Sequence, residues 1–290
     1  MGDVYAIITA VCWSSAVILF DVSTKKFEAI QLNALKNFIG VVGFIATIII
    51  FSLPAPNFSG SELLTLFISG ILGILIADAL FLESLRRLGS GLSAVVSTIY
   101  SPAIFIIAFV LYNETISLES YFGGFLVVSG IAISVYKVPK NITRENLYIG
   151  IVFGIFANIL TAYSVLIVKP VMVDNSIVYV ALYRFSVGLL TAVFICIVSR
   201  GLSSFIMKFK EGLSNKNVLF GSFLGTYLSV IFWLAGYKYT LAGKAAIYNQ
   251  LSTVFIILLA RYFLNEAMTM RKTVGVSLAI VGAILVGLST

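Results

Sequence analysis

Apolar residues in this chain fall in blocks of about twenty, separated by short polar connections. A helix that crosses the hydrocarbon core of a membrane needs ~20 mostly apolar residues. The pattern therefore predicts ten membrane-spanning helices, at residues 4–21, 30–52, 62–84, 90–112, 117–136, 146–168, 177–199, 216–238, 243–264 and 269–288. The short connections leave no room for an extramembrane domain. We expect an all-α polytopic membrane protein.

The second half of the chain repeats the first. A shift of 152 positions places residues 73–134 on residues 225–286 without a gap. The matches include small residues and a polar pair: Gly73 with Gly225, Ala108 with Ala260, and Asn113-Glu114 with Asn265-Glu266. Weaker matches place Ala34-Leu35 on Ala181-Leu182 and Tyr5 on Tyr148. We interpret this as a duplication of a five-helix unit, with copies at residues 1–140 and 141–290.

An odd number of helices in each copy means that the second copy enters the membrane from the opposite side, so the repeats are inverted. The basic residues are distributed unevenly between the two sides. Connections after odd-numbered helices contain Lys25, Lys26, Arg86, Arg87, Lys137, Lys140, Arg144, Arg200, Lys208, Lys210, Lys216, Arg271 and Lys272. The other side has Lys169, Lys238 and Lys244. Because cytoplasmic loops are enriched in Lys and Arg, this count predicts that both termini lie outside.

Composition narrows the class of protein further. Hydrophobic residues make up 60% of the chain and the mean hydropathy is +1.08, which excludes a soluble domain. The net charge of +7 is explained by membrane topology, and no nucleic-acid recognition motif is present. The chain has no histidine, which removes imidazole acid–base chemistry and most metal sites, so we expect no cofactor. Cys12 and Cys196 lie in apolar stretches and do not suggest a disulfide.

The two copies resemble a known family. Each fourth helix ends in Asn-Glu, the first helix contains Trp13-Ser14-Ser15, and the run Ala181 to Phe185 reads Ala-Leu-Tyr-Arg-Phe. These features are similar to those of EamA-type transporters of the drug/metabolite transporter superfamily, over essentially the whole chain. The usual basic residue of the family's second helix would fall at Asn37, with Lys36 beside it. Family members are often drawn with cytoplasmic termini, whereas the charge count here predicts the reverse.

The resemblance implies a secondary active transporter in the plasma or inner membrane. We expect it to move a small polar metabolite, an amino acid or related compound, by alternating access, with export as the implied direction and protons as the coupling ion considered. A carrier or flippase for a lipid-linked or sugar-type substrate is the alternative. An enzyme is disfavoured because the sequence has no histidine, clustered acid pair or phosphate-binding loop. Two complete repeats suffice for a pathway within a monomer.

Charged residues inside membrane helices are candidates for function because they are costly to bury. Asp78 lies deep in the third helix and is the candidate for proton coupling or substrate binding, or else bonds a neighbouring helix. Arg184 either binds a carboxylate or extends to the interface, and Lys36 is a weaker candidate of the same kind. Glu114 and Glu266 lie at helix ends, where a structural turn is the favoured interpretation.

Uncharged polar and aromatic residues at depth are the remaining substrate-binding candidates, because amides and phenols bind ligands without a fixed charge. They are Trp13, Ser14, Tyr100, Asn158, Tyr163, Tyr227, Trp233, Tyr248, Asn249 and Gln250. Anchoring at the membrane interface is the alternative role for the aromatic residues. Pro102 suggests a kink in the fourth helix that its counterpart Val254 would not produce. Residues 203–210 mix apolar and basic side chains and form either an interfacial helix or a basic loop.

Overall fold

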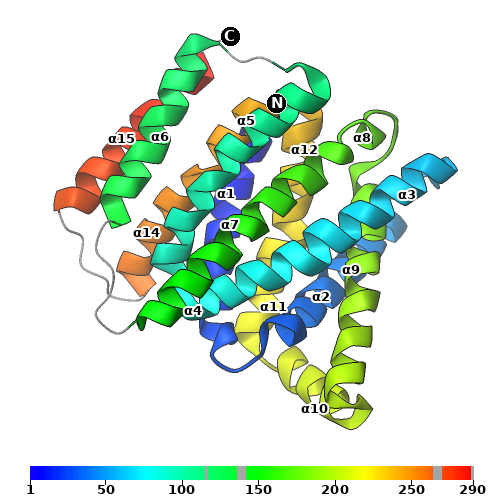
Figure 1. The fold of residues 1–290 in the computed structure, drawn as a ribbon. Helices are drawn as coiled ribbons and strands as arrows, with labels where there is room; N and C mark the ends of the chain where they lie inside the picture. Colours follow the sequence, from blue (N-terminus) through cyan, green and yellow to red (C-terminus); the bar gives the residue numbers. More distant parts are fainter. Residues whose placement is uncertain (115–116, 136–141, 264–269, 289–290) are drawn as a thin grey trace.

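The computed structural model describes residues 1–114, 117–135, 142–263 and 270–288, and these residues form helices joined by short connections (Figure 1). The first half contains α1 (Gly2–Thr24), α2 (Ala29–Ile50), α3 (Gly60–Ser69), the π-helix η1 (Gly70–Ala77), α4 (Asp78–Val96), the 3-10 turn η2 (Ser97–Ile99), α5 (Tyr100–Tyr112) and α6 (Leu118–Val135). The second half contains α7 (Arg144–Ile167), α8 (Val171–Asp174), α9 (Ile177–Arg200), α10 (Leu202–Leu213), α11 (Lys216–Ser222), the π-helix η3 (Phe223–Leu228), α12 (Ser229–Tyr239), α13 (Ala242–Asn249), α14 (Leu251–Phe263) and α15 (Met270–Leu288).

Seven helical stretches among the described residues are long and apolar enough to cross a membrane. They are Gly2–Thr24, Ala29–Ile50, Gly60–Ala94, Arg144–Ile167, Ile177–Arg200, Lys216–Tyr239 and Ala242–Phe263. Two shorter apolar helices, Ser97–Tyr112 and Thr273–Gly282, fall below that length. The protein is therefore a multi-pass helical membrane protein, and the number ten stays a prediction.

Local sequence explains where the helices begin and end. Ser59 caps α3 by accepting the backbone N–H of Glu62, and Thr143 caps α7 in the same way. Gly89 has a φ of 74°, a conformation that most residues avoid, and it divides α4 into two helical segments. The third and fourth predicted helices are therefore separate, although they are nearly continuous in the chain.

The two π-helices occupy equivalent places in the two copies. Shifted by 152 positions, residues 223–228 of η3 fall on residues 71–76, inside η1. A glycine lies in each, and each packs closely on the first helix of the other copy. A Cβ atom on Gly73 would lie 2.7 Å from Ser164 Cβ, and one on Gly225 would lie 2.5 Å from Ala16 Cβ. Glycine is required at both positions because the helices approach so closely.

These contacts correct the alignment between the two copies over the first two helices of each copy. Ala16 and Ser164 make equivalent contacts and lie 148 positions apart. The second helices agree, because Gly40 packs on Thr226 while Gly188, also 148 positions further on, packs on Ile74. From α11 onward the offset is 152. The second copy therefore has four more residues than the first between its second and third helices, in the connection that contains α10. Tyr5 therefore does not correspond to Tyr148.

The corrected offset makes Lys36, and not Asn37, the structural counterpart of Arg184. The sequence comparison placed the usual basic residue of the family's second helix at Asn37, one residue after Lys36. α2 and α9, which carry these two cations, pack directly against each other, and the rings of Phe44 and Phe185 lie 5.5 Å apart between them. The two basic residues are therefore brought to the junction of the two copies.

The last helices of the two copies, α6 and α15, lie side by side at one edge of the bundle (Figure 1). Gly282, near the end of α15, meets the backbone of Gly123, near the start of α6. The two helices are consequently antiparallel, and small residues let their backbones approach. An antiparallel pair of equivalent helices is what an inverted repeat produces.

α10 lies at one end of the bundle and packs on α2. Gly212 is buried against Leu35, and the rings of Phe209 and Phe38 are 5.2 Å apart. On its other side Ile206 and Met207 are exposed. Residues 203–210 therefore form an amphipathic helix and not a basic loop. α8 lies at the opposite end of the bundle. We call the two ends the α10 end and the α8 end.

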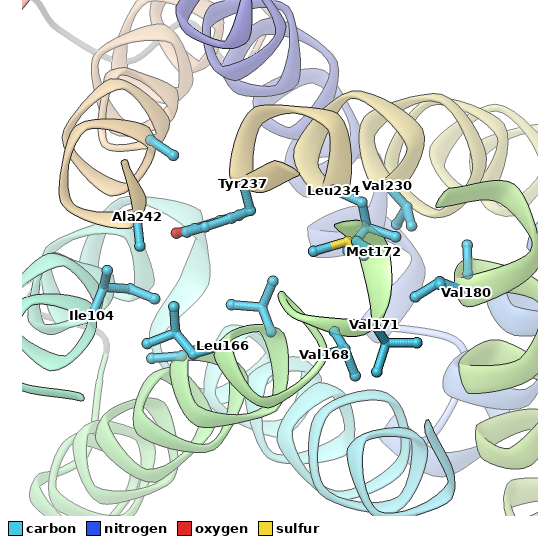
Figure 2. Close-up of a cluster of buried hydrophobic side chains, with 14 of the residues drawn as sticks. Ile104, Leu166, Val168, Val171, Met172, Val180, Val230, Leu234, Tyr237 and Ala242 are labelled. Carbon is cyan, nitrogen blue, oxygen red and sulfur yellow. The ribbon is translucent and has the colours of Figure 1, made fainter. Parts of the chain in front are cut away.

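A large cluster of buried hydrophobic side chains fills the α8 end. Leu166 at the end of α7 and Met172 of α8 are fully buried together with Leu234 and Tyr237 of α12. Figure 2 shows Met172 beside Leu234 and Val230, with Leu166 on the facing helix. The connection between α7 and α9 is thereby folded into the bundle and closes this end.

Candidate functional site

A cavity of about 150 Å³ lies between the two copies of the repeat. Much of its lining consists of residues that correspond to one another in the two copies. At the offset of 152 positions the pairs are Gly73 and Gly225, Ile74 and Thr226, Asp78 and Val230, Phe81 and Trp233, Ser97 and Asn249, and Tyr100 and Ser252. At the offset of 148 they are Thr9 and Ala157, Ala10 and Asn158, Trp13 and Thr161, and Lys36 and Arg184. Both copies therefore build the cavity wall with the same helix faces.

An ion pair joins α2 to the start of α4 at this cavity. Lys36 Nζ lies 2.5 Å from Asp78 Oδ2, and the two side chains are 5% and 18% exposed. Asp78 stands where the π-helix η1 changes to the α-helix α4. A cation buried in the membrane needs such a partner, because the cost of desolvating an isolated charge is high.

Two asparagines extend this connection along α2. Lys36 Nζ also donates to Asn37 Oδ1 at 3.1 Å, and Asn37 donates to Asn33 Oδ1. Asn33 in turn donates to the backbone carbonyl oxygens of Ile74 and Leu75 in η1. π-helical turns often occur at functional sites, and here the side-chain donors of α2 satisfy carbonyl groups of the wide turn. The chain of hydrogen bonds fastens α2 to η1 beside the cavity.

Arg184 of α9 is fully buried and borders the same cavity. Its Nη2 donates to Ser164 Oγ at 2.8 Å, and the guanidinium carbon lies 5.7 Å from the centre of the Trp233 ring. Nε and Nη1 are buried without a hydrogen-bond partner among the described residues. Buried N–H donors are nearly always satisfied, so these two indicate a place for a ligand atom.

Aromatic hydroxyl groups close the wall beside Arg184. Tyr100 and Tyr237 share a hydrogen bond of 2.7 Å between their hydroxyl oxygens, and the indole N–H of Trp233 donates to Tyr100 at 3.2 Å. Tyr237 belongs to the hydrophobic cluster at the α8 end. The aromatic network therefore links the cavity wall to the closed end of the bundle.

Helix interruptions from the two copies meet at the cavity. η2 separates α4 from α5 at Ser97–Ile99, and α13 ends at Asn249, the counterpart of Ser97. Gln250, between α13 and α14, donates its amide N–H groups to the carbonyl oxygens of Ser97 and Thr98 at 3.1 Å each. Both copies are interrupted here, although only the first has a proline nearby. The kink that Pro102 suggests, and that its counterpart Val254 would not produce, stays a prediction.

Eight of the twelve residues proposed from sequence as substrate-binding border the cavity: Trp13, Asp78, Tyr100, Asn158, Arg184, Trp233, Asn249 and Gln250. Four others are placed outside its lining, each next to a residue that does line it. Ser14 bonds back to Val11 O, Tyr227 bonds to Thr47 at 2.6 Å, Tyr163 is 39% exposed on the outer surface, and Tyr248 is buried away from the cavity. A helix turns about 100° per residue, so the neighbour of a cavity residue points elsewhere.

Sequence reasoning gave Lys36 little weight and did not select Phe81, Thr161, Ser164 or Thr226, all of which border the cavity. The Phe81 ring lies beside the Trp13 ring, tilted with respect to it, with ring centres 5.5 Å apart. The signal that could have identified several of these residues is the repeat itself. Phe81 is the counterpart of Trp233, and Thr226 lies next to the matched Gly225.

Glu114 lies at the turn after α5 and not in the cavity. Asn113 has a φ of 50° and ends α5, and Ser117 Oγ accepts the backbone N–H of Ser120 at the start of α6. Glu114 pairs with Lys169 at 3.1 Å, which ties this turn to the end of α7. Glu266 lies outside the described residues.

A multi-pass helical membrane protein with a small cavity between two related halves, bordered by charged side chains, has the architecture of a membrane carrier. The model of the EamA-like transporter family matches residues 1–136 and 148–288, so the chain belongs to that family. The family match places the chain among the drug/metabolite transporters, as the sequence resemblance indicated.

Two individual proteins are similar over nearly the whole chain. An uncharacterized transporter of Archaeoglobus fulgidus is 21% identical over 281 residues, which cover 95% of this chain and 94% of that protein. A protein of known crystal structure superposes with a TM-score of 0.75 at 15% identity, covering 98% of this chain and 95% of the other. The latter shows the fold alone.

Replacing Asp78 tests the ion pair. Asp78→Asn leaves the Lys36 cation buried without its acid, which is expected to lower the free energy of unfolding by about 3–5 kcal/mol. The double variant Lys36→Met/Asp78→Asn removes the unpaired charge and should recover much of that loss. Thermal unfolding of the purified variants in one detergent measures both. A double variant no more stable than Asp78→Asn would contradict this account of the pair.

Proposed function

We propose that the protein is a secondary active transporter that moves a small polar metabolite, an amino acid or a related compound, across the cell membrane, in the direction of export. The observation that carries the proposal is the cavity between the two copies, which is bordered by equivalent residues of both and contains buried charges. Membrane helices rarely bury charge unless it serves a substrate or an ion. Family membership supports the same class of activity.

The arrangement of the copies supports transport by alternating access. We propose ten membrane helices in two inverted five-helix repeats, residues 1–140 and 141–290, in agreement with the antiparallel α6 and α15. In such carriers the two halves exchange conformations around a fixed central site. The paired π-helices η1 and η3 and the paired interruptions at η2 and Gln250 give both halves equivalent places to bend.

Cavity size favours a small solute over the alternative of a lipid-linked or sugar-type substrate. A cavity of about 150 Å³ is on the scale that accommodates a molecule such as benzene. A headgroup carrier would need a larger chamber or a lateral groove. Within one chain the two copies already enclose the cavity, so we propose a monomer.

The distribution of basic residues supports one orientation in the membrane. The α10 end carries Lys25, Arg86, Arg200 and Lys208, and we propose that it faces the cytoplasm of a plasma or inner membrane, with both termini outside. Single cysteines at exposed positions test this in a protein whose Cys12 and Cys196 have been replaced by Ala.

Asn57→Cys, at the α8 end, should react with a membrane-impermeant maleimide in intact cells. Ser203→Cys, in α10, should react only after the membrane is permeabilised. Labelling in the reverse order would overturn the proposed orientation.

Transport is tested directly in proteoliposomes with radiolabelled amino acids and short organic acids. Saturable flux of at least one of these classes is expected. Ala157→Trp places an indole in the cavity and should reduce flux to background, whereas Ile159→Trp, on the exposed face of the same helix, should keep it. Thr161→Phe offers a second cavity-filling variant if Ala157→Trp does not fold.

Absence of flux for every class, or equal flux in the two tryptophan variants, would contradict the proposal. The same vesicles test coupling to protons, for which Asp78 is the candidate residue. An imposed pH gradient should drive flux in the wild type and fail to drive it in Asp78→Asn.

A further inference from the structure

We propose that Arg184 binds the carboxylate group of the transported solute. That carboxylate would pair with Arg184 as the Asp78 carboxylate pairs with Lys36. This inference rests on the proposed transport function and names the chemical class of its substrate. It comes from a difference between the two copies at positions that otherwise correspond.

The two buried cations occupy corresponding positions in the two copies. Lys36 and Arg184 are counterparts at the offset of 148 positions, and both border the cavity. The acid that pairs with Lys36 is Asp78, whose counterpart at the offset of 152 is Val230. Val230 also borders the cavity. The second copy therefore keeps the cation and replaces its acid by an apolar side chain.

Among the described residues, the hydrogen bonding of Arg184 is incomplete. A guanidinium group has five N–H donors in a planar fork that matches the two oxygens of a carboxylate. Ser164 accepts from Nη2, while Nε and Nη1 have no acceptor among the described residues. A carboxylate binds a guanidinium in a bidentate way either through Nε and Nη2 or through Nη1 and Nη2, and Nη2 has a second N–H besides the one that it donates to Ser164. The missing acceptor is therefore of the kind that a substrate carboxylate supplies.

The charges that border the cavity do not balance among the described residues. The described residues that border it include two cations, Lys36 and Arg184, and one anion, Asp78. A solute with one carboxylate would balance the remaining positive charge, whereas an amine or other cation would add to it. Electrostatics therefore favours a carboxylate at Arg184 over a cationic group.

The surroundings of Arg184 suit a small, partly apolar acid. The Trp233 ring covers one side of the guanidinium, and Thr226 Oγ1 is a further buried hydroxyl on the cavity wall without a partner among the described residues. With a volume of about 150 Å³, the cavity matches a solute of the size of alanine or pyruvate more closely than a large acid.

Intrinsic fluorescence provides a binding assay, because both tryptophans of the chain, Trp13 and Trp233, border the cavity. Purified protein carrying Trp13→Phe reports Trp233 alone. The probes are L-alanine, pyruvate, L-alaninamide and ethylamine, which separate the carboxylate from the amine. We expect saturable fluorescence changes with one or both carboxylates and none with the amide or the amine. Binding of L-alanine but not of pyruvate indicates an amino-acid site, and binding of both compounds indicates a general monocarboxylate site.

Substitutions then test the role of Arg184. Val230→Asp supplies an internal acid where the first copy has one, so it should weaken carboxylate binding about 10- to 100-fold. Val230→Asn has the same size without the charge and should weaken binding much less. Arg184→Gln should abolish carboxylate binding, and unaltered elution of the variant shows that it folds.

Two results would overturn the inference: tight binding of L-alaninamide or ethylamine with no binding of either carboxylate, or equal effects of Val230→Asp and Val230→Asn. These results are distinguishable from failure of the proposed function. Flux of amines in proteoliposomes without carboxylate binding leaves a transporter whose substrate is of another class. Carboxylate binding that depends on Arg184, without any flux, leaves the anion site but not the transporter.

Discussion

A buried cation in a membrane helix must find a negative partner, and this requirement organises the centre of the protein. Lys36 meets it with Asp78, and the asparagines of α2 extend the contact to the carbonyl groups of η1. The interaction fixes α2 against the one stretch of the third helix that has π geometry. The cavity lies against these elements, so its wall depends on the same interaction.

The duplication gives the molecule two versions of this arrangement and makes them unequal. Gly73 and Gly225 keep the same close helix contacts, and the π-helices and the interruptions of the fourth helices recur in register. The cation recurs as Arg184 but the acid does not, since Val230 stands where the first copy has Asp78. The equivalent frameworks support the proposed exchange of conformations between the two halves, and the unequal charges support the proposed binding of a ligand by Arg184.

Sequence alone could predict the helical class, the duplication and the depth of most cavity residues, because hydrophobic length and small matched residues are local signals. It could not predict which face of a helix points inward. Tyr163 and Tyr227 lie one residue away from the cavity residues Ser164 and Thr226 and point elsewhere. It also misaligned Lys36 with respect to Arg184, because the extra residues beside α10 change the offset and only three-dimensional contacts show where.

The central claim is that the cavity between the two copies is the transport pathway. The most direct measurement is the accessibility of Thr161→Cys, a cavity residue of α7, in protein that lacks Cys12 and Cys196. A membrane-impermeant thiol reagent is added to either face of sealed vesicles of known orientation. Alternating access predicts labelling from both faces, with transport blocked once the cysteine is modified. Labelling from one face only, or modification without loss of transport, would contradict the account.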